Sequence, residues 1–365
     1  MVSLIAHARA EPEVCCEAMT TKALRIGVVG AGNNTRVRHI PGLKAVSGVE
    51  IVSVANRSRE SSERVAREFG IPRVYDSWQE LVRATDTDAI CIGTWPNLHC
   101  EITLAALEAG KHVLCEARMA MNVAEARRML DGARRHPNLV TQLVPSPPTL
   151  EVDGTIQNLL AEGYLGQLLA VDLRGMQGRF VDRAAPLHWR QDASLSGFNI
   201  LNMGIWYEAM IRWTSPATRV MAATLVAVPE RRDAAGVVQK VTVPDHVDIL
   251  ATLAGGAIAH LRFSAVTALA PANEVWLFGS EGTLRLDADA KRLYGGRRGA
   301  TALEEIVIPP DKRIGWRVEE EFVNAVRGLE KITRTSFEDG LLYMEFTEAV
   351  ARSASSGRAV SLPLS

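Results

Sequence analysis

The chain has 365 residues, of which 47% are hydrophobic and 23% charged, and its formal net charge is −1 at neutral pH. This composition is typical of a globular protein, and the length is sufficient for two domains. The balanced charge gives no support to a nucleic-acid-binding or membrane-binding surface. No apolar run approaches the roughly 20 residues that span a bilayer.

The first 21 residues contain no apolar segment after a basic start, so they do not look like a signal peptide. We expect residues 1–21 to form a loosely ordered extension and the protein to be cytoplasmic. The five cysteines lack the spacing of a zinc site or of a disulfide framework. Cys91 and Cys115 lie in apolar runs, where cysteine usually packs as a small hydrophobic residue. The histidines show no paired metal-ligand spacing, so no metal site is expected.

Strand-like and helix-like segments alternate from residue 24 to about residue 144. The apolar runs are nearly continuous, which is typical of parallel strands buried on both faces. A doubly wound parallel sheet of the Rossmann type is therefore predicted for residues 22–145. The predicted strands are 24–29, 50–55, 89–93, 112–115 and 139–144.

A cluster of prolines after residue 144 predicts a domain boundary. Beyond it, residues 246–253 and 257–263 alternate around Gly255-Gly256, the pattern of a β-hairpin. We expect residues 146–365 to form an α+β domain with an open, mostly antiparallel sheet for substrate binding and self-association. Amphipathic helices are expected around Phe322 and Phe346, the second one capped by Ser336.

The first predicted strand runs into Gly30-Ala31-Gly32, a glycine turn that opens a helix. This strand–turn–helix context is the one that a dinucleotide-binding fingerprint requires. Only two of its three glycines are present, because Thr35 occupies the third place. The turn and the free N–H groups of the helix start predict contacts to a nucleotide diphosphate. The residues predicted here are Gly30, Gly32, Asn33, Asn34 and Thr35.

The end of the second predicted strand indicates which nucleotide is bound. NAD-dependent enzymes usually hold the ribose 2′-hydroxyl with Asp or Glu at this place, whereas this chain has Asn56-Arg57-Ser58. No carboxylate repels a 2′-phosphate, and a guanidinium beside a hydroxyl can bind one. NADP(H) is therefore predicted in preference to NAD(H). The alternative is that Arg57 is only a solvated residue at the start of a charged helix.

Several separated motifs resemble the glucose–fructose oxidoreductase/inositol dehydrogenase (Gfo/Idh/MocA) family. They are the glycine turn, Thr94-Trp95-Pro96-Asn97-Leu98-His99, residues 109–116, Trp189-Arg190, residues 279–284 and residues 357–363. The resemblance implies a Rossmann domain followed by an α/β domain whose open sheet forms dimers or tetramers. It also implies oxidation or reduction of a secondary alcohol or ketone on a sugar, polyol or related ring compound.

The resemblance also implies positions for cofactor contacts. Glu116 would lie on the nicotinamide side, and Gln142 would lie near the reactive ring. The alternative for His99 is a structural role as a cap residue at the start of a helix. The full implied set is Thr94, Trp95, Pro96, Asn97, His99, Glu116, Gln142, Trp189 and Arg190.

The chain departs from the family pattern at its catalytic positions. Where the family usually has Glu-Lys-Pro, this chain has Glu116-Ala117-Arg118, so the lysine that polarises the reacting oxygen is absent. Family members also carry Asp, His and Asp at spacing i, i+4, i+7, which lie on one helical face. Those places hold Asn202, Trp206 and Ala209, and none of these transfers a proton at neutral pH.

Glu208 does not replace the missing acids, because it is displaced toward the other face of the helix. Its i+4 neighbour Arg212 predicts a surface ion pair. Trp206, together with Tyr207 and Phe198, is expected either to offer an aromatic surface to a ring substrate or to pack in the core.

Substitute acid–base groups are expected in the segment before that helix. His188 has a suitable pKa range for proton transfer, and Asp192 is placed to tune it or to bind substrate. Arg118 is expected to stabilise the reacting oxygen, and Asn202 and Arg118 to orient the substrate. Arg190 is expected to hold a carboxylate or to orient a hydroxyl. The alternative for each of these residues is that its side chain only forms a structural hydrogen bond or is polar because the loop is solvated. The predicted catalytic set is His188, Asp192, Arg118 and Asn202.

Three functions fit these observations. The first is an NADP(H)-preferring oxidoreductase that acts on a cyclic polyol, a sugar derivative or a dihydrodiol-like compound. The second is a redox-assisted glycoside-cleaving enzyme with tightly bound nucleotide. The third is a nucleotide-binding regulator without chemistry.

Overall fold

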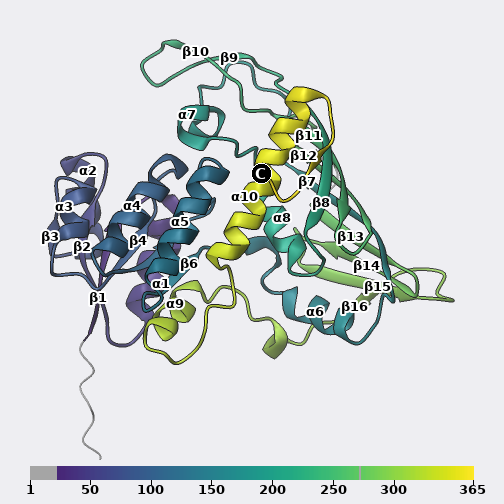
Figure 1. Cartoon of the computed structure of the whole chain (residues 1–365), viewed down its shortest axis with the longest axis horizontal. Helices are drawn as coiled ribbons and strands as arrows, with labels where there is room; N and C mark the ends of the chain where they lie inside the picture. Colours follow the sequence, from purple (N-terminus) through teal and green to yellow (C-terminus); the bar gives the residue numbers. More distant parts are fainter. Residues whose placement is uncertain (1–22, 271–272) are drawn as a thin grey trace, which may run out of the picture.

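The computed structural model describes residues 23–270 and 273–365, so the predicted N-terminal extension lies outside the described residues. The described chain contains two large sheets, one in each half of the sequence (Figure 1). None of the described helices is both long and apolar enough to cross a membrane. The two sheets flank a central group of helices, and α10 (Phe337–Ser356) runs between them.

The N-terminal sheet has six parallel strands in the order β3-β2-β1-β4-β5-β6. This order is that of the dinucleotide-binding Rossmann fold, and it confirms the predicted doubly wound sheet. The strand bounds are β1 Leu24–Val29, β2 Val49–Ala55, β3 Arg73–Val74, β4 Ala89–Ile92, β5 His112–Cys115 and β6 Thr141–Leu143.

Helices connect these strands and cover both faces of the sheet (Figure 1). The side chain of Ser58 accepts a hydrogen bond from the Ser61 N–H at the start of α2, and Ser77 caps α3 in the same way. Such caps satisfy N–H groups that the first turn leaves free. The elements are a π-helical segment Thr35–His39, α1 Ile40–Ala45, α2 Arg59–Phe69, α3 Trp78–Arg83, α4 Pro96–Glu108 and α5 Val123–Arg135.

The C-terminal half forms a nine-stranded sheet in the order β16-β15-β14-β13-β7-β12-β11-β8-β17. All neighbours are antiparallel except β12 and β7, which confirms an open, mostly antiparallel sheet. The predicted hairpin is present as β11 and β12. The strands are β7 Leu168–Met176, β8 Ala217–Leu225, β11 His246–Leu253, β12 Ile258–Ser264, β13 Glu274–Gly279, β14 Gly282–Asp287, β15 Arg292–Arg297, β16 Glu304–Ile306 and β17 Val360–Ser361.

Helices cover only one face of this sheet (Figure 1). The rings of Tyr207 and Phe346 stack with centroids 3.7 Å apart, which joins α8 to α10 in the core. Ser336 caps α10, as predicted, through a reciprocal capping box with Asp339. The remaining elements are α6 Asp153–Ala161, α7 Ala193–Ser196, α8 Met203–Ile211, α9 Val318–Val326 and a two-stranded ribbon of β9 Glu230–Arg232 with β10 Val238–Lys240.

The core of the Rossmann half includes side chains from late in the sequence. Val318, Phe322 and Val323 of α9 are buried in the same apolar cluster as Ile26 and Val28 of β1. Burial of apolar surface is the main favourable term in folding. The nucleotide-binding half is therefore completed by a helix from the C-terminal part of the chain.

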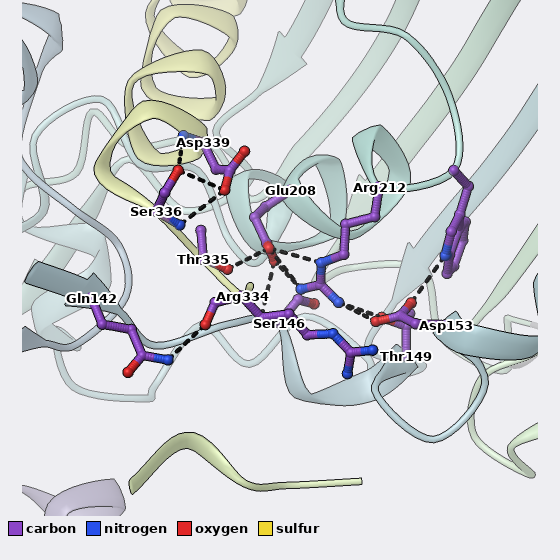
Figure 2. A network of polar contacts seen from close by, with 11 residues as sticks. Gln142, Ser146, Thr149, Asp153, Glu208, Arg212, Arg334, Thr335, Ser336 and Asp339 are labelled. Carbon is purple, nitrogen blue, oxygen red and sulfur yellow. Dashed lines mark hydrogen bonds and ion pairs between the residues drawn. The ribbon is translucent and has the colours of Figure 1, made fainter. Parts of the chain in front are cut away.

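A buried polar network ties α8 to the segment after β6, to α6 and to the segment before α10 (Figure 2). The Glu208 carboxylate accepts hydrogen bonds from the Arg212 guanidinium, from the Thr335 hydroxyl at 2.6 Å and from the Ser146 N–H at 2.9 Å. Arg212 also pairs with Asp153 of α6. Glu208 is only 4% exposed, so the prediction of a surface ion pair is wrong. The i+4 spacing gave the partner correctly, but the neighbouring elements that bury the pair come from distant sequence.

Candidate functional site

The predicted nucleotide turn adopts a conformation that requires glycine. Gly30 has φ +82°, in the left-handed region, and a Cβ there would lie 2.7 Å from the Thr94 backbone nitrogen. A Cβ on Gly93 would lie 2.0 Å from the Thr35 hydroxyl oxygen. Thr35 donates that hydroxyl to the Gly30 carbonyl at 3.3 Å. The Thr35 hydroxyl therefore supports the turn, and the missing side chains of Gly30 and Gly32 let the turn pack closely on the backbone after β4.

Of the three residues after β2, two have side chains that are hydrogen-bonded to the backbone, and one has an exposed side chain. The Asn56 side-chain oxygen accepts a hydrogen bond from the Ala31 N–H at 2.7 Å, which ties β2 to the glycine turn. Ser58 is engaged as the α2 cap. Arg57 is exposed, and its guanidinium carbon lies 5.7 Å from the centroid of the Trp95 ring. Arg57 is thus the group of the three whose side chain is available to a ligand.

An aromatic stack brings the C-terminal half over the edge of the Rossmann sheet. The Trp95 and Trp189 rings lie 5.9 Å apart with an interplanar angle of 19°. The Arg190 guanidinium lies 4.3 Å from the centroid of the Trp189 ring, at a distance typical of a cation–π contact. The structure therefore brings together four residues that the sequence predicted near the cofactor, namely Arg57, Trp95, Trp189 and Arg190.

His99 is fully buried inside α4. Its two ring nitrogens lie 3.0 and 2.9 Å from the carbonyl oxygens of Thr94 and Arg118, so the ring joins the loops after β4 and β5. Burial lowers the pKa of His99. Trp95, not His99, is the N-cap residue of α4, and the His99 ring acts as a tie between two loops of the site.

Glu116 is part of a buried charged triad. The ring of His39 lies 3.0 Å from Glu116 through Nε2 and 2.6 Å from Glu319 through Nδ1. Burial disfavours the charged ring, but hydrogen bonds to the two carboxylates outweigh it and raise the pKa of His39 to about 9. Asn34 donates to the same Glu116 oxygen, and the Ala117 N–H donates to the other one at 3.1 Å. His39 therefore holds Glu116 at the end of β5.

No motif in the sequence indicates that His39 and Glu319 belong to the site. Their positions are separated by 280 residues, and neither belongs to a recognised motif. A weak local signal existed, because His39 follows the nucleotide turn within one helical segment. Such a residue would face the same edge of the sheet as the turn itself.

Some of the buried polar atoms without a hydrogen-bond partner belong to residues that follow the strands of the Rossmann sheet. Among the described residues, the buried atoms without a hydrogen-bond partner include those of loop and helix residues after β4, in β6 and at the start of α8. Such atoms are rare in native proteins and call for a ligand or bound water. Hydroxyl, amide and guanidinium groups suit the ribose, carboxamide and diphosphate of a nucleotide. Six of the twelve such atoms in the described part of the chain belong to the loops after β4 and β5, to α4, to β6 and to the segment that leads into α8: Thr94 Oγ1, Asn97 Oδ1, Arg118 Nε, Gln142 Oε1, Asn199 Oδ1 and Asn202 Oδ1.

Gln142 is held by elements of the C-terminal half. Its amide nitrogen donates to Glu321 and to the Arg334 carbonyl, both at 2.7 Å (Figure 2 shows the second contact). Its amide oxygen is the atom without a partner. The side-chain nitrogen of Gln142 is therefore held by the C-terminal half, whereas its side-chain oxygen remains without a hydrogen-bond partner within the described ranges.

The predicted acid–base loop uses its polar side chains as helix caps. His188 Nδ1 accepts a hydrogen bond from the Arg190 N–H at 3.2 Å, and the Asp192 carboxylate accepts from the Ser194 N–H at 2.9 Å. The structure gives no hydrogen bond between His188 and Asp192. Partial burial and the charge of Arg190 lower the pKa of His188, so its ring is neutral at neutral pH.

Arg118 and Asn202 lie on the inner side of the site. The Arg118 side chain packs against the start of α8, because a Cβ on Gly204 would lie 3.4 Å from the Arg118 Cδ. Trp206 and Tyr207 are buried in the core, so the core-packing alternative holds for them, whereas Phe198 is 42% exposed. Asn202 is the N-cap residue of α8, and its buried side-chain oxygen has no hydrogen-bond partner among the residues that the structure describes.

Two family models match the chain. The first, described as oxidoreductase family, NAD-binding Rossmann fold, matches residues 24–143. The second, described as GFO/IDH/MocA C-terminal domain, matches residues 154–285. The chain belongs to the Gfo/Idh/MocA oxidoreductase family. The resemblance drawn from the motifs is thereby confirmed, and with it the NAD-binding Rossmann character of the N-terminal half.

Known members of the Gfo/Idh/MocA family show how far the similarity extends. An uncharacterised oxidoreductase of Rhizobium meliloti is 30% identical over 52% of this chain and 55% of its own length. A trans-1,2-dihydrobenzene-1,2-diol dehydrogenase of Bos taurus is 29% identical over 72% of this chain and 74% of its own length. A structure of levoglucosan dehydrogenase with NADH and L-sorbose superposes with a TM-score of 0.84 at 21% identity, covering 93% of this chain and 99% of that one. The last comparison supports the fold alone.

Proposed function

We propose that this chain is an NADP(H)-preferring oxidoreductase acting on a secondary alcohol or ketone of a ring compound. The substrate would be a cyclic polyol, a sugar derivative or a dihydrodiol-like compound. The observation that carries the proposal is the group of unpartnered buried polar atoms on the loops after β4 and β5 and before α8, together with a glycine turn that leaves no room for side chains. The dihydrodiol dehydrogenase of Bos taurus supports the class of reaction.

Different residues of the site bind the diphosphate, the 2′-phosphate and the substrate. Gly30 and Gly32 let the diphosphate approach the backbone, and Arg57 binds a 2′-phosphate. When bound, the nicotinamide supplies the hydride donor or acceptor. Arg118 and Asn202 orient the substrate.

His188 is proposed to move the proton that hydride transfer requires. Its Nδ1 is engaged as a helix cap, which leaves Nε2 to exchange a proton with substrate or water. The lowered pKa favours the neutral ring, which acts as a base in the oxidative direction.

Replacing His188 with alanine is expected to lower kcat by at least about tenfold, because a positioned acid–base group contributes roughly 10²–10⁴ in rate. The Kd for NADPH is expected to stay near the wild-type value. His188→Asn keeps a capping acceptor but transfers no proton, so it should be equally impaired. Wild-type kcat in the asparagine variant would show that His188 acts only as a cap.

The nucleotide itself discriminates among the proposed functions. Purified protein is titrated with NADPH and NADH by fluorescence, and its nucleotide content after purification is assayed. An empty site that prefers NADPH and turns over ring alcohols supports the oxidoreductase. Stoichiometric bound nucleotide, with no net absorbance change in turnover, favours glycoside cleavage. Binding without turnover favours a regulator, and absence of binding contradicts all three.

Self-association is proposed through the uncovered face of the nine-stranded sheet. Met221 and Leu250 are paired neighbours on this face, and they are 52% and 55% exposed. Ile258 and Phe278 add apolar surface to the same face. Burying such side chains against a second copy removes them from water.

Leu250→Arg is therefore expected to convert a dimer or tetramer into monomer, measured by light scattering after gel filtration. Val307→Arg, at an exposed residue after β16, serves as the matched control and should not change the mass. A wild-type protein that is monomeric at micromolar concentration would contradict the proposal.

A further inference from the structure

Arg118 is a buried cation without a protein partner. Its side chain is 4% exposed, its Nε has no acceptor, and no hydrogen bond from its guanidinium is found within residues 23–270 and 273–365. Burial, with the positive charge of Arg190, lowers the pKa of Arg118 to about 10. A buried charge is costly unless it is paired and hydrogen-bonded. The site therefore favours a negative group that the protein does not provide.

Arg190 supplies a second cation beside the Arg118 loop, because His99 bridges the carbonyls of Arg118 and Thr94, and Trp95, next to Thr94, stacks on Trp189. The Arg190 guanidinium is fixed by stacking on Trp189, which in turn stacks on Trp95. Among the described residues no carboxylate forms an ion pair with Arg190, and burial lowers its pKa. Stacking leaves the edge of the guanidinium, with its N–H donors, free for hydrogen bonds.

The acidic residues nearby are already engaged. The charge of Glu116 acts on both arginines, but its oxygens are occupied by His39, Asn34 and the Ala117 N–H. Asp192 accepts from the N–H and hydroxyl of Ser194. Asn202 contributes a neutral amide. The two guanidinium groups are thus left without an anion.

On the basis of the proposed function, we propose that the ring substrate carries a carboxylate, which Arg118 and Arg190 bind together. Guanidinium groups match the planar carboxylate with paired hydrogen bonds. The unpartnered Asn202 oxygen accepts a neighbouring hydroxyl of the ring. The substrate class is therefore a cyclic hydroxy acid of the uronate type, not a neutral sugar.

The experiment uses the protein saturated with NADPH, so that the diphosphate does not compete for Arg190. Methyl α-D-glucuronoside and methyl α-D-glucoside share the locked ring and differ in the carboxylate. Their Kd values are measured by calorimetry for wild type, Arg118→Gln, Arg118→Lys and Arg190→Gln. Arg179→Gln, at an exposed arginine after β7, is the matched control.

The acid is expected to bind at least about tenfold more tightly than the neutral glycoside, as a charge-assisted hydrogen bond implies. This ratio should fall to near one in Arg118→Gln and Arg190→Gln, fall partly in Arg118→Lys, and stay unchanged in Arg179→Gln. Equal binding of the two glycosides, no binding of the acid, or an unchanged ratio in Arg118→Gln would overturn the proposal. If the carboxylate proposal fails but the enzyme turns over neutral ring alcohols, the proposed oxidoreductase function still stands. If the wild-type protein does not bind NADPH, the proposed function itself is contradicted.

Discussion

Replacing Arg57 with alanine is expected to weaken NADPH binding by about tenfold or more and to leave NADH binding within about twofold. A charge-assisted hydrogen bond to a 2′-phosphate contributes roughly 1.5–3 kcal/mol, which corresponds to at least tenfold in Kd. Asn56 and Ser58 cannot compensate, because the glycine turn and the α2 cap engage them. The measurement is a fluorescence titration of each nucleotide.

Arg59 provides the matched control for this experiment. It is an exposed arginine two residues further along the chain, paired with Glu63 and Asp76. Arg59→Ala should bind both nucleotides like wild type. An equal loss of NADPH and NADH affinity in Arg57→Ala would show that its packing on Trp95 matters and that it does not select the phosphate.

Replacing Glu208 with alanine is expected to lower the free energy of unfolding by about 3–5 kcal/mol, the range for breaking a buried ion pair by removing one partner. The change leaves Arg212 with Asp153 as its single carboxylate and leaves the Ser146 N–H and Thr335 hydroxyl without their acceptor (Figure 2). Urea unfolding followed by circular dichroism measures the effect.

Glu63→Ala removes a carboxylate from an i, i+4 ion pair with Arg59 on the exposed surface of α2. Exposed pairs of this kind contribute about 0.5 kcal/mol or less. This variant should therefore unfold close to wild type. A loss below about 1 kcal/mol in Glu208→Ala would contradict the view that the network stabilises the packing of α8 on the segments around it.

The sequence was sufficient for the parts of the fold that local patterns encode. Continuous apolar runs such as 89–93 and 112–115 indicate parallel strands, and Gly255-Gly256 indicates the hairpin of β11 and β12. Ser336 indicates the start of α10. These features depend on backbone geometry and burial within a few residues, so they are readable from one segment at a time.

The site depends on contacts that no local pattern encodes. Arg118 is near Arg190, and Glu116 meets His39 and Glu319, only because separate elements converge on one sheet edge. Glu208 shows the same limit. Its i+4 spacing predicted Arg212 as its partner, but nothing in the local sequence predicted that the pair is buried. The residue types at the site were readable from sequence, whereas their partners required the fold.

The packing of α9 on the Rossmann core bears on how the chain acquires its structure during synthesis. Phe322 fills the apolar cluster around β1, and Glu319 completes the charged triad with His39. Both residues are translated only after the first 318 residues of the chain. The nucleotide-binding half is translated first, but its apolar core is complete only after α9 has been synthesised. A truncated chain that ends before residue 318 would therefore expose apolar side chains of that half to water.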